Sequence, residues 1–153
     1  MTIGLPTTAW EVMPVIGDEI AAYDEVVDYA LLKIGRIPER EPVDVLDRVP
    51  KNNKWVKNLS IGTKTVYTGY PSGLGPLTIE GTISGYTDMD NIYIHSFAWP
   101  GSSGSGVFNH NNKLIGFIMA INLGYTEFGI TVLEDIVIVV PVHKINWDNL
   151  KKE

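Results

Sequence analysis

Short apolar stretches alternate with turn-forming residues along most of this chain. The stretches are rich in β-branched and aromatic side chains, and glycine and proline lie between them. Short strands separated by frequent turns are typical of an all-β sandwich or barrel. The pattern predicts strands over Trp10–Ile16, Ile20–Tyr23, Tyr29–Ile34, Thr65–Gly69, Leu77–Gly85, Asn91–Ser96, Gly106–Asn109, Leu114–Ile121 and Ile136–Pro141.

Four other segments carry different signals. Asn109–Asn112 predicts a tight hairpin turn, because asparagine tolerates a positive φ. The prolines and charges of Arg36–Ile61 predict a surface connection between two sub-barrels. The Gly, Thr and Glu residues of Leu123–Asp135 predict a second surface excursion. The tail Val142–Glu153 predicts one short amphipathic helix, with lysines at its end to suit the helix dipole.

Composition and charge narrow the class of protein. The chain has 153 residues, 44% of them hydrophobic, which is enough for a packed core without a metal or disulfide. It contains no cysteine, so disulfides and cysteine-based zinc sites are excluded. This absence fits a reducing compartment and is compatible with the cytoplasm. A net charge of −6 without a basic cluster argues against nucleic acid as a partner.

No segment of the chain carries a targeting or membrane signal. Met1–Trp10 lacks the basic start and the long apolar run of a secretory signal peptide. The most apolar stretch, Ile136–Val140, is far too short to cross a bilayer. The sequence therefore predicts a soluble protein, and it implies no membrane partner, metal or cofactor.

The segment Pro100–Asn109 carries the clearest chemical signal. Ser103 lies between glycines, just before an apolar strand. Glycines on both sides let the backbone turn tightly and bring its N–H groups close to whatever the serine touches. Such a group of amides can hold a developing oxyanion. An ordinary Gly/Ser turn is the alternative on composition alone.

A family resemblance changes that balance. Gly-Ser-Ser-Gly-Ser-Gly over Gly101–Gly106, then Val-Phe-Asn, a turn and Lys113–Ile118, resembles the G-x-S-G-[GS] nucleophile loop of trypsin-like serine proteases. The chain most resembles the cysteine-free bacterial and viral branch that includes glutamyl endopeptidases and HtrA-type enzymes. The resemblance implies that Ser103 is the nucleophile and that the backbone N–H groups of Gly101 and Ser103 form the oxyanion hole.

Further segments match the same family in the same order. Val27–Ile34 resembles the Asp-x-Ala-Leu-Leu segment, which implies that Asp28 is the catalytic aspartate. A turn-capping role is the alternative for Asp28, and Asp24 is a weaker competitor. The stretches Val66–Gly73, Ile79–Gly85 and Val139–Val142 resemble later strands of the family. The resemblance runs from about Tyr23 to about Leu150.

The histidine that a catalytic triad requires is missing from its expected place. A histidine takes the serine proton, and in the chymotrypsin order it precedes the aspartate. No histidine precedes Asp28, and the three histidines of the chain lie downstream. His110 and His143 read as turn and surface residues. His95 lies on the strand leading to the nucleophile, so it either lines the substrate pocket or packs as an ordinary strand residue.

The resemblance also indicates which residues line the pocket for the side chain before the cut. They lead into the nucleophile loop or lie on the strand after it: His95, Ser96, Phe97, Ala98, Met119, Ala120 and Ile121. Their apolar character and lack of an acid favour apolar or aromatic substrate side chains. Plain core packing is the alternative role, above all for Met119 and Ile121.

Together these features predict a trypsin-like double Greek-key β-barrel, all-β, with an incomplete first barrel and a short C-terminal helix. Residues 1–60 would hold the remnant of the first barrel with Asp28, and residues 61–153 the second barrel with the nucleophile. The predicted function is a serine endopeptidase acting on a peptide or protein substrate, with little activity in this chain alone. Its histidine would come from a missing N-terminal segment or from a second polypeptide, the chain being a fragment in the first case.

Two further interpretations compete with the peptidase. The first is a protease-derived module that no longer cuts and binds an extended peptide by strand addition. The missing histidine favours it. The second is a generic β-barrel with a coincidental Gly/Ser turn, which leaves the ordered series of motifs unexplained.

Overall fold

The structure is a computed structural model that describes residues 19–33, 38–39, 41, 43–45, 59–126 and 129–146. The chain divides into two compact units, Met1–Pro42 with Asn146–Glu153, and Val43–Ile145. The boundary expected near residue 60 stays a prediction. The strand expected over Trp10–Ile16 lies outside the described residues.

The first unit contains an antiparallel hairpin of β1 (Glu19–Asp24) and β2 (Tyr29–Lys33). The connecting turn is capped by Asp24, whose carboxylate accepts hydrogen bonds from the amides of Val26 and Val27 at 2.9 and 3.0 Å. The amide of Asp28 donates to the carbonyl of Asp24 at 2.9 Å, and Asp28 has a φ of 64°. Aspartate is one of the few residues that tolerate this left-handed conformation, so the sequence suits the turn.

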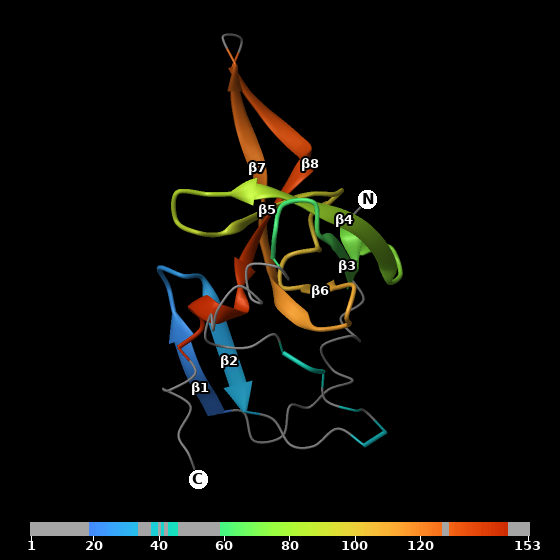
Figure 1. Ribbon diagram of the computed structural model, residues 1–153, viewed down its shortest axis with the longest axis vertical. Coiled ribbons are helices and arrows are strands. Elements are labelled where there is room, and N and C mark those ends of the chain that lie inside the picture. Colours follow the sequence, from blue (N-terminus) through green and yellow to red (C-terminus); the bar gives the residue numbers. More distant parts are fainter. Residues whose placement is uncertain are drawn as a thin grey trace, which may run out of the picture. The chain divides into compact units, whose positions relative to one another are not determined.

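The second unit is a closed antiparallel barrel of six strands (Figure 1). These are β3 (Lys64–Gly69), β4 (Leu77–Tyr86), β5 (Ile92–His95), β6 (Gly106–Asn109), β7 (Leu114–Thr126) and β8 (Gly129–Pro141). Their order around the barrel is β3-β4-β5-β8-β7-β6, and β6 pairs with β3 to close it. The all-β class predicted from the sequence is confirmed.

Alternating side chains of these strands fill the barrel. Ile83 on β4, Ile94 on β5 and Val107 on β6 are buried, as the period of two along a strand requires. Gly116 on β7 allows β8 to approach, because a Cβ at this position would lie 2.3 Å from the carbonyl oxygen of Val140. Part of the segment expected as a surface connection also contributes to the unit. Leu59 is fully buried, and the carbonyl of Asp44 accepts from the amide of Leu114 at 2.8 Å.

The hairpin between β6 and β7 confirms the asparagine turn. The Asn109 side-chain oxygen accepts hydrogen bonds from the amides of Asn111 and Lys113 at 2.9 and 3.1 Å. Asn112 takes the positive φ, at 58°.

The segment Leu123–Asp135, expected as an irregular excursion, instead continues β7 and β8 as a paired ribbon. The register runs from Asn122 opposite Leu133 to Thr126 opposite Gly129. Figure 1 shows the ribbon projecting beyond the rest of the barrel. Its glycine and glutamate residues suggested a loop, but its apolar residues alternate with a period of two, which is the signal of a strand.

Two 3₁₀ helices complete the described structure, η1 (Pro71–Gly73) and η2 (Val142–Lys144). The C-terminal helix expected from Val142 is this short η2 turn, and residues 147–153 lie outside the described residues. Within the described part of the chain, no helix is long and apolar enough to span a membrane.

Candidate active site

The segment between β5 and β6 that carries Ser103 consists of two consecutive turns. In the first, the amide of Ser102 donates to the carbonyl of Trp99 at 3.0 Å, and Gly101 has a φ of 100°. Proline at the second position and glycine at the third are the features of a type II turn. In the second turn, the amide of Ser105 donates to the carbonyl of Ser102 at 3.1 Å, with a φ of 81° at Gly104. Glycine is needed at both positions because only it adopts these φ values without strain.

Strand β7 fixes the second turn. The amide of Gly104 donates to the carbonyl of Ile118 at 2.7 Å, and the amide of Ile118 donates to the carbonyl of Ser105 at 3.0 Å. Met119 follows at a register shift between β7 and β8, where it forms a bulge. Bulges are frequent next to active sites, where they redirect backbone groups.

Ser103 is exposed at the tip of the second turn, and its hydroxyl makes one long hydrogen bond of 3.4 Å to the carbonyl of Met119. Within the described residues, the amides of Gly101 and Ser103 have no hydrogen-bond acceptor. An exposed serine hydroxyl next to two available backbone donors is an arrangement that can receive a carbonyl group and hold the charge that develops on its oxygen.

Behind this turn, Tyr67 on β3 joins the segment to the barrel. Its hydroxyl donates to the carbonyl of Phe97, and the side chain of Ser102 is buried nearby. Burial raises the pKa of the Tyr67 phenol, and the Ser102 hydroxyl offsets part of that rise. Sequence reasoning did not find Tyr67, and its only signal was an inward position in an alternating strand.

The residues expected to line a pocket divide into exposed and buried ones. Phe97 is 55% exposed, and its ring stacks on that of Trp99, with centroids 5.9 Å apart and planes 10° apart. Ala98 between them is buried. Ser96 is also buried, and its hydroxyl donates to the carbonyl of Glu80 at 2.9 Å, so its role is to tie β5 to β4. Sequence reasoning missed Trp99, which was visible only as an aromatic residue beside the nucleophile motif.

On β7, the remaining pocket candidates are Met119, Ala120 and Ile121. Met119 is half-buried, and the side chains of Ala120 and Ile121 lie outside the described ones. A lining role for these three residues stays a prediction.

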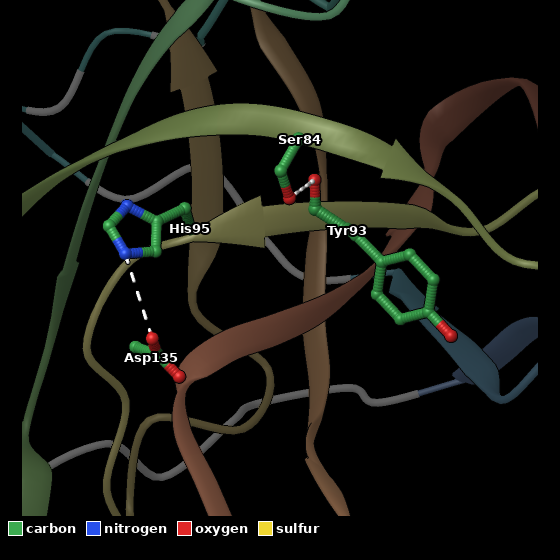
Figure 2. Close-up of polar contacts among 4 residues, drawn as sticks. All are labelled: Ser84, Tyr93, His95 and Asp135. Carbon is green, nitrogen blue, oxygen red and sulfur yellow. Dashed lines mark hydrogen bonds and ion pairs between the residues drawn. The ribbon is translucent and has the colours of Figure 1, made fainter. Parts of the chain in front are cut away.

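His95 forms an exposed pair on the outer face of the barrel. Its Nε2 atom lies 3.7 Å from a carboxylate oxygen of Asp135, and the two side chains are 66% and 55% exposed. Figure 2 shows this pair beside Ser84 and Tyr93, where the Ser84 hydroxyl donates to the carbonyl of Tyr93 at 3.2 Å. An exposed pair of this kind contributes little stability.

The other two histidines also lie within the described residues. His110 is exposed in the β6–β7 turn. His143 is half-buried in η2, where burial, and then the charge of Lys144, lower its pKa against a smaller opposing effect of Asp90. Because the hydrogen bond of the Ser103 hydroxyl goes to Met119, none of the three histidines accepts the Ser103 proton in this structure.

Asp28 belongs to the hairpin unit, whereas Ser103 belongs to the barrel unit, and each is described within its own unit. The Asp28 side chain is exposed and makes no hydrogen bond within the described residues. The turn is instead capped by Asp24, the weaker competitor for the catalytic role. No group of three or more His, Asp or Glu residues in the described part of the chain could hold a metal ion.

The barrel and the doubly turned serine segment define a trypsin-like β-barrel fold. Residues 12–117 match the family model of the trypsin-like peptidase domain, and the chain belongs to this family. A search of curated protein sequences gave no match.

Several solved structures are similar to the chain. The HtrA-type protease AlgW with a decapeptide is 22% identical, with a TM-score of 0.60, and the match covers 81% of this chain and 36% of that one. An inactive serine-to-alanine form of Rv3671c from M. tuberculosis is 18% identical, with a TM-score of 0.54 and coverage of 81% and 58%. The serine endoprotease from Yersinia pestis is 22% identical, with a TM-score of 0.58 and coverage of 81% and 39%. The match thus spans between about a third and three fifths of these proteins.

Proposed function

We propose that this chain is the serine-bearing part of an endopeptidase that cleaves peptide bonds through an acyl-enzyme on Ser103. The observation that carries the proposal is the exposed Ser103 hydroxyl beside the two available amides of Gly101 and Ser103. The family of the chain and its structural neighbours support a serine protease.

The reaction follows from this arrangement. The Ser103 oxygen attacks the substrate carbonyl carbon while its proton passes to a histidine. The amides of Gly101 and Ser103 stabilise the oxyanion, each contributing about 3 kcal/mol to the transition state. The histidine then returns the proton to the leaving amine as the C–N bond breaks, and water hydrolyses the ester.

The histidine is supplied from outside this chain, and Asp28 orients it. The exposed Asp28 carboxylate, which no described residue engages, supports this role. A segment preceding the chain is the source we favour, because Ser103 and Asp28 are both retained. A second polypeptide is the other possible source.

Apolar or aromatic side chains are the proposed substrate preference. The stacked Phe97 and Trp99 rings next to the Ser103 turn offer an apolar contact surface without any acid. Such a surface does not complement the cationic side chains that an acidic pocket would select.

A second candidate is a peptide-binding module that does not cut. The observation that favours it is the hydrogen bond of Ser103 to the Met119 carbonyl, which leaves the hydroxyl without a base in the described residues. Such a module would hold an extended peptide through backbone hydrogen bonds.

Labelling with a fluorophosphonate probe separates the two candidates. We expect weak labelling of this chain alone and strong labelling once the upstream histidine segment or the second polypeptide is present. Ser103→Ala should abolish it, and removal of such a nucleophile costs about 10⁶-fold in rate. The matched control is Ser84→Ala, an exposed serine on the outer face of the barrel. No labelling under either condition would favour the binding module.

A further inference from the structure

The loop between β3 and β4 contacts the backbone of the serine segment directly. The amide of Ser72, in η1, donates a hydrogen bond of 2.7 Å to the carbonyl of Pro100. This carbonyl belongs to the Pro100–Gly101 peptide, which is the central peptide of the first type II turn.

The direction of the Pro100 carbonyl sets the direction of the Gly101 amide. In a trans peptide the C=O and N–H groups point to opposite sides of the chain. While the Pro100 oxygen faces Ser72, the Gly101 N–H must point away from the β3–β4 loop. A half-rotation of this peptide would break the bond to Ser72 and would put the carbonyl oxygen where the amide donor had been.

The same loop leaves no room for a side chain at position 101. A Cβ atom on Gly101 would lie 2.5 Å from the carbonyl oxygen of Tyr70 and 3.4 Å from the amide nitrogen of Ser72. The loop therefore contacts the peptide through a hydrogen bond and its α-carbon through close packing.

The loop adopts a conformation that costs free energy in order to present this amide. Ser72 has a φ of 53°, a value that non-glycine residues rarely adopt, and Gly73 follows with a φ of 74°. The amide of Leu74 donates to the carbonyl of Pro71 at 3.0 Å, which closes the turn around them. Strained residues of this kind persist where the surrounding structure holds them, and they concentrate at functional sites.

We propose that Ser72 is a positioning residue whose main-chain amide keeps the Pro100–Gly101 peptide in the orientation that offers the Gly101 N–H to an oxyanion. The inference rests on the proposed function, because it concerns the same serine site. Its chemistry uses the backbone of Ser72 and not the hydroxyl. It also makes the β3–β4 loop a point from which the oxyanion donor can be withdrawn.

The first test measures the hydrogen bond and needs no activity. In the isotope-labelled chain, we expect scalar coupling between the Ser72 amide nitrogen and the Pro100 carbonyl carbon, and slow exchange of the Ser72 amide proton. Absence of the coupling, together with exchange at the rate of an open loop, would overturn the inference even if the protein proves to be a peptidase.

The second test uses a pair of variants at position 72. Ser72→Gly keeps the amide and accommodates the positive φ, whereas Ser72→Pro removes the amide and cannot adopt that φ. We expect Ser72→Pro to shift the Gly101 amide resonance and to slow fluorophosphonate labelling about 10²-fold or more, the effect of losing one oxyanion donor. The glycine variant should restore both readouts toward those of the unchanged chain.

Gly75→Pro is the control for a proline in the same loop, because the Gly75 amide donates no hydrogen bond within the described residues. Methyl resonances of the barrel core report whether each variant is folded. Equal labelling by folded Ser72→Pro and Ser72→Gly would refute the inference, whereas absence of labelling in every protein, with the Ser72 coupling present, would refute the proposed function alone.

Discussion

The turns that carry Ser103 and Asp28 use similar backbone conformations but are held in different ways. Each places a residue of positive φ at or beside the reactive group, Gly104 next to Ser103 and Asp28 itself. The Ser103 segment is fixed by hydrogen bonds of 2.7 Å from two sides, from β7 and from the β3–β4 loop. The Asp28 turn is held by its own hairpin through Asp24.

This difference separates a preorganised half of the site from one that depends on its surroundings. A single two-stranded hairpin is at best marginally stable in water, whereas a closed barrel has no unpaired edge. The nucleophile geometry is therefore built into the barrel unit. The acid acquires its geometry from whatever packs against the hairpin.

Replacing the acid gives the largest expected effect among the variants that probe this comparison. Asp28→Asn keeps a residue that tolerates a φ of 64° but removes the charge. With the histidine supplied, we expect kcat/KM to fall about 10⁴-fold while the melting temperature stays unchanged. Retained activity in steady-state peptide hydrolysis would show that another group orients the histidine.

A smaller effect is expected from crowding the oxyanion turn. Gly101→Ala places a Cβ 2.5 Å from the Tyr70 carbonyl oxygen, at a φ of 100° that alanine disfavours. The Gly101 amide should leave its position, which lowers the labelling rate about 10²-fold. The control is Gly75→Ala, where a Cβ meets nothing within 4 Å. Equal labelling rates of the two variants would contradict the assignment of the oxyanion hole.

Removing the turn cap tests the hairpin without touching the barrel. Asp24→Ala deletes the acceptor of the Val26 and Val27 amides, and loss of such a cap costs about 1 kcal/mol. Hydrogen exchange should accelerate in β1 and β2 and stay constant in β3 to β8. Asp24→Asn, which retains an acceptor oxygen, should show a smaller change. Faster exchange throughout the barrel would mean that the two units unfold together.

The smallest expected effect is a pH dependence of the barrel unit that arises from His143. Burial lowers the pKa of His143 in the folded chain below its ordinary value of about 6.5. As pH falls below about 6.5, the unfolded chain binds a proton that the folded chain resists, so the free energy of unfolding decreases. Urea denaturation between pH 7.5 and pH 5 should show this slope (pH range chosen at about one unit or more on either side of the ordinary value). His143→Gln should flatten it, and His110→Gln, in an exposed turn, should not.

Local signals in the sequence predicted local structure well. Alternation of apolar residues located the six barrel strands, and the asparagines of Asn109–Asn112 specified their hairpin turn. The family motif placed Ser103 in a glycine-flanked turn, and the structure has that turn. The continuation of β7 and β8 through Leu123–Asp135 was missed because its composition resembled a loop.

Contacts between distant segments could not be predicted from the sequence. The stacking of Phe97 on Trp99 depends on how the segment after β5 turns, which no periodicity encodes. The hydrogen bond between Ser72 and Pro100 joins loops that the sequence separates by two strands, β4 and β5. It uses a backbone amide, so no residue type signals it.

The closure of the barrel through β3 and β6 has a consequence for the order of folding. The pairs β6–β7 and β7–β8 join neighbours in the chain, whereas β3 and β6 are separated by two intervening strands. Pairings between distant segments pay a larger loop-closure entropy, so they form late. The β3–β4 loop reaches the Pro100 carbonyl only when β3 is in place. A nascent chain would therefore display Ser103 before its oxyanion donor is oriented, and reactivity would arise as the last step of folding.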